Sequence, residues 1–387
     1  MDKKYKIGII YNDDSNWIGG TYYIENLISS FQWLPQEKQP EIIVLSRSKS
    51  EYEKLKNVTE NHDLKHFSTD WHPSLFKRGV NKLTRSVLSR HIFSTRLDNI
   101  INVAFPNPLG IIYYEVKKKV FWLPDFQHYR LPHLFSKEEK TIRNRWFELP
   151  TKGNYPVVLS SQAAKDDYFD IFPDAKNQVY VLPFAVKMPD LGGETSIKKT
   201  LEKYEITKPY FLCSNQFWVH KNHMLVLKAV KKLVGTFSNI QILFTGKEYD
   251  PRDPAYTDTL KKYVVKHKLE KNISFLGFID RGDQLRLMIR ALAVIQPSLF
   301  EGWSTVIEDA KCLGQNILAS SLPVNKEQLE NYPKFHKAFF DPYDESELAE
   351  LLTSYQDRDE VVNEYDYRSD IRRFAENFIS IVDSVMR

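Results

Sequence analysis

Short apolar segments alternate with amphipathic segments along the whole chain, and this alternation constrains the fold more than any other feature. Strand, helix and strand in regular succession are typical of parallel α/β architecture. In the first half the apolar runs predict strands at 7–11, 42–45, 100–104, 120–123, 157–160 and 179–182. The second half repeats the rhythm, with strands predicted at 210–214, 240–245, 273–276, 294–297, 317–320 and 338–340.

The chain is predicted to form two Rossmann-like domains. Its 387 residues exceed what one hydrophobic core usually supports. Pro189 and the pair Gly192-Gly193 mark a linker between the halves. We therefore expect an N-terminal domain at 1–187 and a C-terminal domain at 188–365. Residues 366–387 are expected to form a C-terminal helix, whose pattern leaves open whether it packs back on the N-terminal domain.

The overall composition is that of an ordinary globular protein. Apolar residues make up 42% of the chain and the formal net charge is only +4, which argues against disorder and against a dedicated nucleic-acid binder. Cys213 and Cys312 lie in apolar patterns, as reduced core cysteines do. No stretch approaches the roughly 18 apolar residues that span a bilayer. We expect a cytoplasmic protein, with membrane contact only peripheral.

Polar residues that follow predicted strands are the candidates for a site, because open α/β sheets bind ligands at the carboxyl ends of their strands. Gly19 and Gly20 follow the first strand and open a helix, where close backbone approach and free N–H groups suit an anion; a plain tight turn explains them equally well. Asp125, Gln127 and His128 follow the strand at 120–123 and have the chemistry to bind hydroxyls or relay a proton, although a histidine there is often structural.

Two loops in the second half carry stronger signals. Residues 214–223 place Lys221 just before a helix, where its charge and the helix dipole would act together on a phosphate; a solvated surface lysine is the alternative. Residues 297–310 hold Glu301 in the loop and Glu308 in the following helix. Carboxylates accept paired hydrogen bonds from vicinal diols; the alternative is that Glu308 serves only the helix dipole.

A basic amphipathic stretch spans residues 75–96. Six lysines and arginines alternate there with apolar residues, which is the pattern of a segment that lies on an anionic membrane. Ordinary surface helices show the same pattern and are the more common explanation.

Together these loops resemble the GT-B glycosyltransferases, specifically glycosyltransferase family 4. The resemblance implies two Rossmann-like domains facing a central cleft. It implies that Lys221 binds the donor diphosphate, Glu301 the donor sugar and Glu308 the ribose, while His128 faces the donor sugar. The implied catalytic residues are His128, Lys221 and Glu301. The implied donor-binding set is Gly19, Gly20, Asn215, Gln216, His220, Lys221, Glu301, Gly302, Trp303, Ser304, Thr305 and Glu308, and the acceptor-binding pair is Asp125 and Gln127.

Two features depart from the family pattern. Asn215-Gln216 stands where the family usually has Gly-Arg, and six residues separate the glutamates where seven are common. The first departure would remove one positive ligand of the diphosphate.

The resemblance further implies a retaining, metal-independent hexosyltransferase with no cofactor, which uses a nucleoside diphosphate sugar as co-substrate. Mannose, rhamnose and glucose are the hexoses considered, and the acceptor is expected to be a glycan or lipid-linked hydroxyl in O-antigen or capsule synthesis. Two alternatives stay open, a sugar-nucleotide epimerase of the same build and a catalytically silent binding scaffold. A nicotinamide-dependent oxidoreductase is disfavoured because no G-x-G-x-x-G fingerprint follows the first strand.

Overall fold

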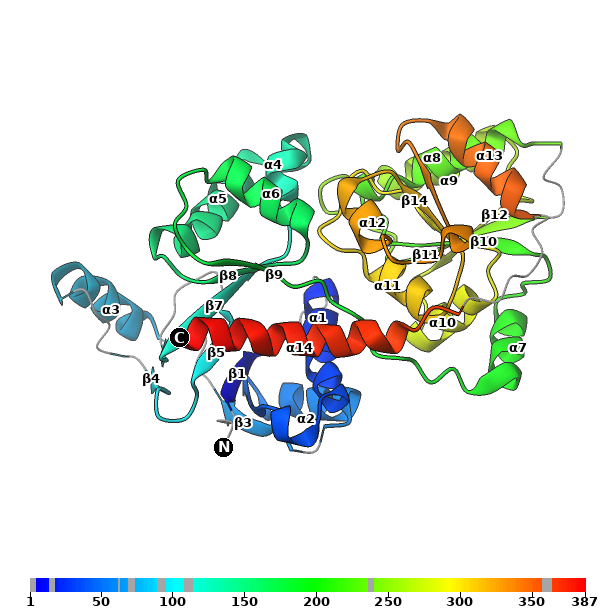
Figure 1. Cartoon of the computed structure of the whole chain (residues 1–387). Helices are drawn as coiled ribbons and strands as arrows, with labels where there is room; N and C mark the ends of the chain where they lie inside the picture. The colour runs from blue at the N-terminus through cyan, green and yellow to red at the C-terminus, as the bar shows by residue number, and fades with distance from the viewer. Residues whose placement is uncertain are drawn as a thin grey trace. The chain divides into compact units, whose positions relative to one another are not determined.

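The computed structural model describes residues 5–13, 18–61, 63–68, 74–88, 93, 95–107, 114–235, 240–356 and 364–387. Two compact units make up the chain (Figure 1). The first unit contains residues 1–126, 137–187 and 368–387, and the second contains 127–136 and 188–367. The short segment 127–136 thus groups with the second unit, although the chain on either side of it belongs to the first.

The first unit is built on a seven-stranded parallel sheet. Its order is β3 (Lys65–Ser68), β2 (Glu41–Ser46), β1 (Lys6–Ile10), β5 (Val103–Asn107), β7 (Lys118–Leu123), β8 (Val157–Leu159) and β9 (Val179–Val181). Helices α1 (Ile18–Ser30), α2 (Lys49–Thr59), α4 (Gln127–Arg130), α5 (Lys137–Lys152) and α6 (Gln162–Ile171) lie between these strands in the chain. A two-stranded sheet of β4 (Thr95–Arg96) and β6 (Tyr114–Glu115) and the helix α3 (Leu75–Leu88) complete the described first half.

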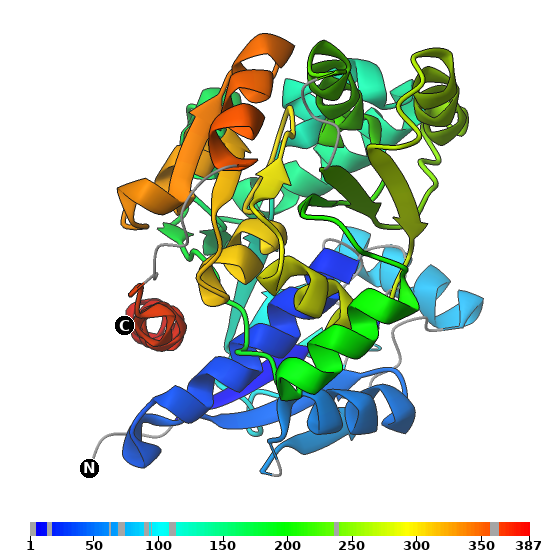
Figure 2. The same ribbon diagram turned by 90° about the vertical axis from the view of Figure 1, so that its right-hand side faces the viewer.

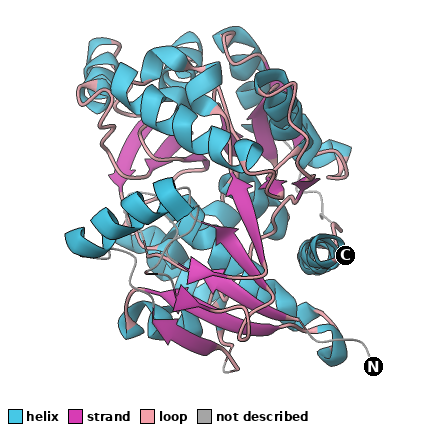
Figure 3. Cartoon of the chain, turned by 90° about the vertical axis from the view of Figure 1, so that its left-hand side faces the viewer, coloured by secondary structure: helices cyan, strands magenta, loops and turns pink. Residues whose placement is uncertain are grey.

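The second unit has a six-stranded parallel sheet. Its order is β12 (Ile273–Gly277), β11 (Gln241–Thr245), β10 (Tyr210–Ser214), β13 (Val294–Gln296), β14 (Ile317–Ser320) and β15 (Lys337–Phe340). Figure 3 shows the strands of the sheets side by side with helices around them. The helices are α7 (Gly193–Lys203), α8 (His223–Lys232), α9 (Tyr256–Lys266), α10 (Arg281–Ile289), α11 (Thr305–Cys312), α12 (Pro323–Gln328) and α13 (Glu345–Gln356).

Both sheets follow the order of the doubly wound Rossmann fold. Counted from β10, the second sheet runs 3-2-1-4-5-6, and the first runs the same way from β1 with a seventh strand added. The expectation of two parallel Rossmann-like units is confirmed.

The C-terminal helix α14 (Tyr367–Met386) packs on the first unit. Phe378 lies against Phe31 and Phe105, with ring centroids 5.7 Å and 5.1 Å apart, and Phe374 lies 5.8 Å from Tyr23. Figure 2 views this helix along its axis. Because its apolar stripe is covered by the first unit, the last twenty residues complete a core begun at the N-terminus.

Two predicted elements differ from the observed ones, a missed polar strand and a strand with shifted bounds. The strand β3 was missed because Lys65–Ser68 is a short edge strand with a polar pattern. The strand expected at 100–104 lies instead at Val103–Asn107, and Ile101, which lies before the strand, is buried in a cluster with Ile10 and Leu45.

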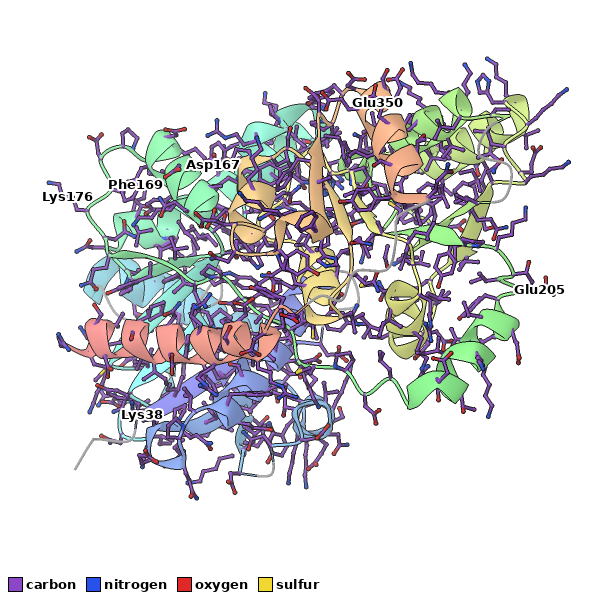
Figure 4. All side chains as sticks on the ribbon, turned by 45° about the vertical axis from the view of Figure 1, so that its right-hand side comes forward. Lys38, Asp167, Phe169, Lys176, Glu205 and Glu350 are labelled. Carbon is purple, nitrogen blue, oxygen red and sulfur yellow. The ribbon has the colours of Figure 1, made fainter. Side chains whose placement is uncertain are left out.

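Charged side chains cover the surfaces of both units. Figure 4 shows Lys38 and Lys176 of the first unit and Glu205 and Glu350 of the second pointing away from the ribbon. Among the described residues, no helix is long and apolar enough to cross a membrane.

We predict that Phe378→Ala destabilises the first unit by about 3–5 kcal/mol, because it removes a ring that is 1% exposed and leaves a cavity. Chemical denaturation monitored by circular dichroism measures the loss. Asn377→Ala is the matched control, since this neighbour is exposed on the same helix and should change stability by no more than about 0.5 kcal/mol. Equal effects of the two substitutions would contradict the packing described.

Candidate functional site

The candidate site of the second unit lies where the strand order of its sheet reverses. Strand β10 pairs with β11 on one side and with β13 on the other, so the chain leaves β10 in one direction and returns on its far side at β13. In open α/β folds, ligands bind at the carboxyl edge of the sheet beside such a switch point. Lys221 follows β10 and Glu301 follows β13.

These two side chains form a buried ion pair. Lys221 Nζ lies 2.6 Å from Glu301 Oε1, and the two side chains are only 15% and 8% exposed. Gln296, at the end of β13, donates from Nε2 to the same Glu301 oxygen at 2.6 Å and accepts from Asn215 Nδ2 at 3.1 Å. Gln296, which the sequence analysis did not single out, therefore connects Asn215 to the pair of Lys221 and Glu301. All three of these residues were predicted site residues.

The loop that carries Lys221 is held from several sides. Asn222 has a left-handed backbone, with φ of 57°, and its side chain donates to the carbonyls of Pro297 at 3.1 Å and Pro342 at 2.8 Å. Gly246, after β11, has φ of 147°, and a Cβ there would lie 2.1 Å from the Asn215 carbonyl oxygen. Glycine is therefore required where these two loops meet. The position of Lys221 is fixed by its backbone rather than by its own side chain alone.

His220 is buried beside a second cation. Its Nδ1 lies 3.4 Å from Nη2 of Arg252, which follows β11. Burial, with help from Lys221 and Arg252, lowers the pKa of His220 well below its ordinary value. Arg252 is in turn paired with the fully buried Asp250 at 3.0 Å. His220 is thus a neutral imidazole, and Nδ1 is the natural acceptor for the arginine.

His223 is a core residue. It lies at the start of α8 and stacks on Phe217, with centroids 4.5 Å apart and an interplanar angle of 10°. Complete burial lowers its pKa to about 3.

Glu308 lies in a separate buried network. Lys311 Nζ and Gln328 Nε2 donate to its Oε1 at 3.0 Å and 2.9 Å, and the Tyr367 hydroxyl donates to Oε2 at 2.7 Å. The carboxylate is 1% exposed. Both oxygens of Glu308 thus have protein partners, whereas Lys221 and Gln296 both donate to Oε1 of Glu301.

Between the two glutamates, the loop turns into α11. Ser304 is its N-cap and accepts from the Ile307 N–H at 3.3 Å, and its own N–H donates to Gln328. The predicted donor-binding residues Gly302, Trp303 and Thr305 are partly exposed around this N-terminus. The backbone N–H groups at this N-terminus form the positive end of the helix dipole, which favours an anion.

The remaining predicted residues divide between the units. Gly19, Gly20 and Asp125 belong to the first unit, whereas Gln127 and His128 belong to the second. Gly20 and His128 are buried, and Gly19 is exposed. Gln216 is half-buried beside Gly246. Within the described part of the chain, no group of three or more His, Cys, Asp or Glu side chains has the arrangement to hold a metal ion.

Three residues that sequence reasoning missed are Gln296, Arg252 and Arg281. Gln296 ends an apolar strand and Arg252 lies in a Pro- and Asp-rich loop, so neither stands in a motif. Arg281 starts α10 and pairs with the buried Asp309 at 2.5 Å. Burial raises the pKa of that carboxyl, and Arg281 opposes the shift. For Arg252 and Arg281 the only signal was a charged residue between two strands, and Gln296 gave none.

We predict that His223→Phe removes a pH-dependent loss of stability. The ring of His223 is neutral in the folded state, whereas in the unfolded state it binds a proton with the ordinary pKa of 6.5. Protonation below that pH therefore favours the unfolded state and lowers the free energy of unfolding. This contribution is fully present above pH 6.5 and is lost as the pH falls toward 3. Between pH 8 and 5.5 the wild type should lose about 1.4 kcal/mol more than the variant.

Urea denaturation at several pH values measures the difference. His133→Phe is the control, because His133 is an exposed residue of the same unit. Parallel stability curves for wild type and His223→Phe would show that burial of this ring does not govern its protonation.

Comparisons with known proteins give one family match and a shared fold. Residues 196–375 match the model of the family "Glycosyl transferases group 1". No curated protein sequence is similar enough to the chain to count as a relative.

Several solved structures share the fold along nearly the whole chain. A glycosyltransferase from Rickettsia africae ESF-5 has a TM-score of 0.64 at 15% identity, covering 99% of this chain and 96% of that one. Anabaena Alr3699/HepE, solved in complex with UDP and glucose, has a TM-score of 0.61 at 14% identity, with 99% and 95% covered. WaaG, a glycosyltransferase involved in lipopolysaccharide biosynthesis, has a TM-score of 0.59 at 14% identity, with 98% and 95% covered.

Residues 196–375 are thus similar to the group 1 glycosyl transferases, and the chain as a whole has the GT-B glycosyltransferase fold.

Proposed function

We propose that the protein transfers a hexosyl unit from a nucleoside diphosphate sugar to a hydroxyl of a glycan or lipid-linked acceptor. The observation that carries the proposal is the buried pair of Lys221 and Glu301 at the switch point of the second sheet. A cation and a carboxylate meet there at the carboxyl edge of a sheet, which is where open α/β folds bind nucleotides.

Each member of the pair has a role in transfer. Lys221 would bind the donor diphosphate and stabilise the charge that develops on it as the glycosidic bond breaks. Glu301 Oε2 would accept from the sugar hydroxyls, since Oε1 is held by Lys221 and Gln296. The N-terminus of α11 adds backbone donors for the same anion. With these ligands, the reaction we propose is metal-independent and needs no cofactor.

The more specific parts of the proposal rest on the resemblance to family 4. These are retention of the anomeric configuration, the ribose contact of Glu308, the roles of Gly19, Gly20 and His128, and a place in surface polysaccharide synthesis. HepE is solved in complex with UDP-glucose, and WaaG is involved in lipopolysaccharide biosynthesis. They support a nucleotide-sugar donor and a surface glycan acceptor here by analogy.

We predict that Lys221→Ala lowers kcat/KM by roughly 30-fold or more, because loss of one partner of a buried charge pair costs about 2–5 kcal/mol. The donor base is identified first by thermal shift with UDP, GDP, dTDP and ADP. A nucleotide at 100 times its Kd should stabilise the wild type by about 2.7 kcal/mol, and the variant should lose most of that response.

Lys228→Ala is the matched control, since this lysine is exposed on the adjacent helix α8. Near-normal turnover of Lys221→Ala would overturn the assignment. Turnover of the donor to an isomer without acceptor would favour the epimerase, and absence of nucleotide binding by the wild type would favour the silent scaffold.

We further propose that the acceptor is reached at an anionic membrane surface through residues 75–96. On α3, Leu75, Phe76 and Leu83 are 83%, 71% and 67% exposed. At 3.6 residues per turn they share one side of the helix, while the buried Asn81 lies on the other. Lys77 and Lys82 are exposed beside them. Apolar side chains flanked by lysines suit a bilayer that carries negative charge.

We predict that Phe76→Ser combined with Leu83→Ser reduces binding to vesicles with one third anionic lipid by about tenfold, because burial of these side chains contributes roughly 1.5 kcal/mol or more. Vesicle co-sedimentation at low salt measures it. Thr84→Ala, on the same helix, is the control. Equal binding of the double variant and the wild type would exclude α3 as the contact.

A further inference from the structure

Arg252 contacts the segment 127–136 within the second unit. The elements of this segment are α4 (Gln127–Arg130) and a short 3₁₀ turn at Pro132–Leu134. Arg252 Nη1 donates to Gln127 Oε1 at 3.1 Å, and the guanidinium carbon lies 5.4 Å from the centre of the Phe135 ring. These contacts engage the segment near both of its ends.

The other side of the same guanidinium contacts the loop that carries Lys221. Nη2 lies 3.4 Å from His220 Nδ1, and the guanidinium carbon lies 5.4 Å from the centre of the Trp218 ring. Since His220 and Trp218 precede Lys221 by one and three residues, Arg252 connects two predicted parts of the site.

Arg252 is itself firmly oriented. Asp250 Oδ1 accepts from its backbone N–H and from Nε, each at 3.0 Å, and Asp250 Oδ2 accepts from the Val219 N–H at 3.0 Å. Asp250 is fully buried and Arg252 is 14% exposed. A planar guanidinium with five donors can make these contacts together, and a lysine ammonium cannot.

We infer that Arg252 is a positioning residue, which holds the segment with Gln127 and His128 against the loop with His220 and Lys221. This inference rests on the proposed function, because the two loops were assigned to the site there. Arg252 acts through the segment and not by binding the diphosphate, since Asp250, Gln127 and His220 already engage its Nε, Nη1 and Nη2.

Hydrogen–deuterium exchange of the full chain tests the placement without requiring activity. In Arg252→Ala and in Arg252→Lys, the peptide covering 127–136 should exchange roughly tenfold faster, while the strands of both sheets keep their protection. Arg290→Ala is the matched control, since it removes an exposed arginine of the same unit that pairs with Glu194. Unchanged exchange at 127–136 in both Arg252 variants would overturn the inference.

Kinetics separate positioning from phosphate binding. With the nucleotide found by thermal shift, Arg252→Lys and Arg252→Ala should both keep the wild-type Kd within about twofold, while kcat falls by roughly tenfold or more. Recovery of kcat by lysine, or a loss of nucleotide affinity as large as that of Lys221→Ala, would overturn the inference in favour of a charge contact. Failure of the wild type to bind any nucleotide would count against the proposed function and would leave the exchange experiment to decide the positioning role.

Discussion

The ion pair between Lys221 and Glu301 is the interaction on which the candidate site depends. The two residues are 80 positions apart and meet only because the second sheet reverses its strand order between β10 and β13. Two buried charges of this kind are tolerable only when they are paired and further hydrogen-bonded. Gln296 and Asn215 meet that requirement on one side, and the backbone of the Asn222 turn fixes the lysine on the other. The fold and the proposed chemistry therefore impose the same constraint on these positions.

The two glutamates of the 297–310 loop are in different physical situations, although the sequence presents them as a pair. Glu301 keeps one carboxylate oxygen for a ligand, whereas Lys311, Gln328 and Tyr367 occupy both oxygens of Glu308. A ribose bound by Glu308 would have to displace one of these donors, of which Tyr367 donates to Oε2. Because Tyr367 begins α14, whose apolar face belongs to the first unit, the proposed ribose contact would involve the residue at which the chain passes from one unit to the other.

The sequence predicted the elements that bury apolar side chains on a regular period. All six strands of the second sheet and the bounds of α14 could be read from that period, because burial on both faces makes parallel strands nearly continuous apolar runs. It could not predict β3, which is polar and lies at an edge, or Gln296, which sits at the end of an apolar run and carries no motif. Lys221 and Glu301 were found because each follows a strand. That they contact one another was beyond the sequence, since the contact depends on strand order.

Because His220 and His223 are neutral, they add no positive charge to the buried cations of this site. Besides burial, Lys221 and Arg252 both lower the pKa of His220, and a protonated imidazole beside them would add a third positive charge in a desolvated position. Burial lowers the pKa of His220 and of His223, so both rings stay uncharged, and the charges that remain are balanced by Glu301 and Asp250. An entering diphosphate would bring negative charge to a loop that is balanced without it. On binding, a phosphate would replace Glu301 as the partner of Lys221. Both oxygens of Glu301 would then be able to accept hydrogen bonds from the hydroxyls of the attached sugar.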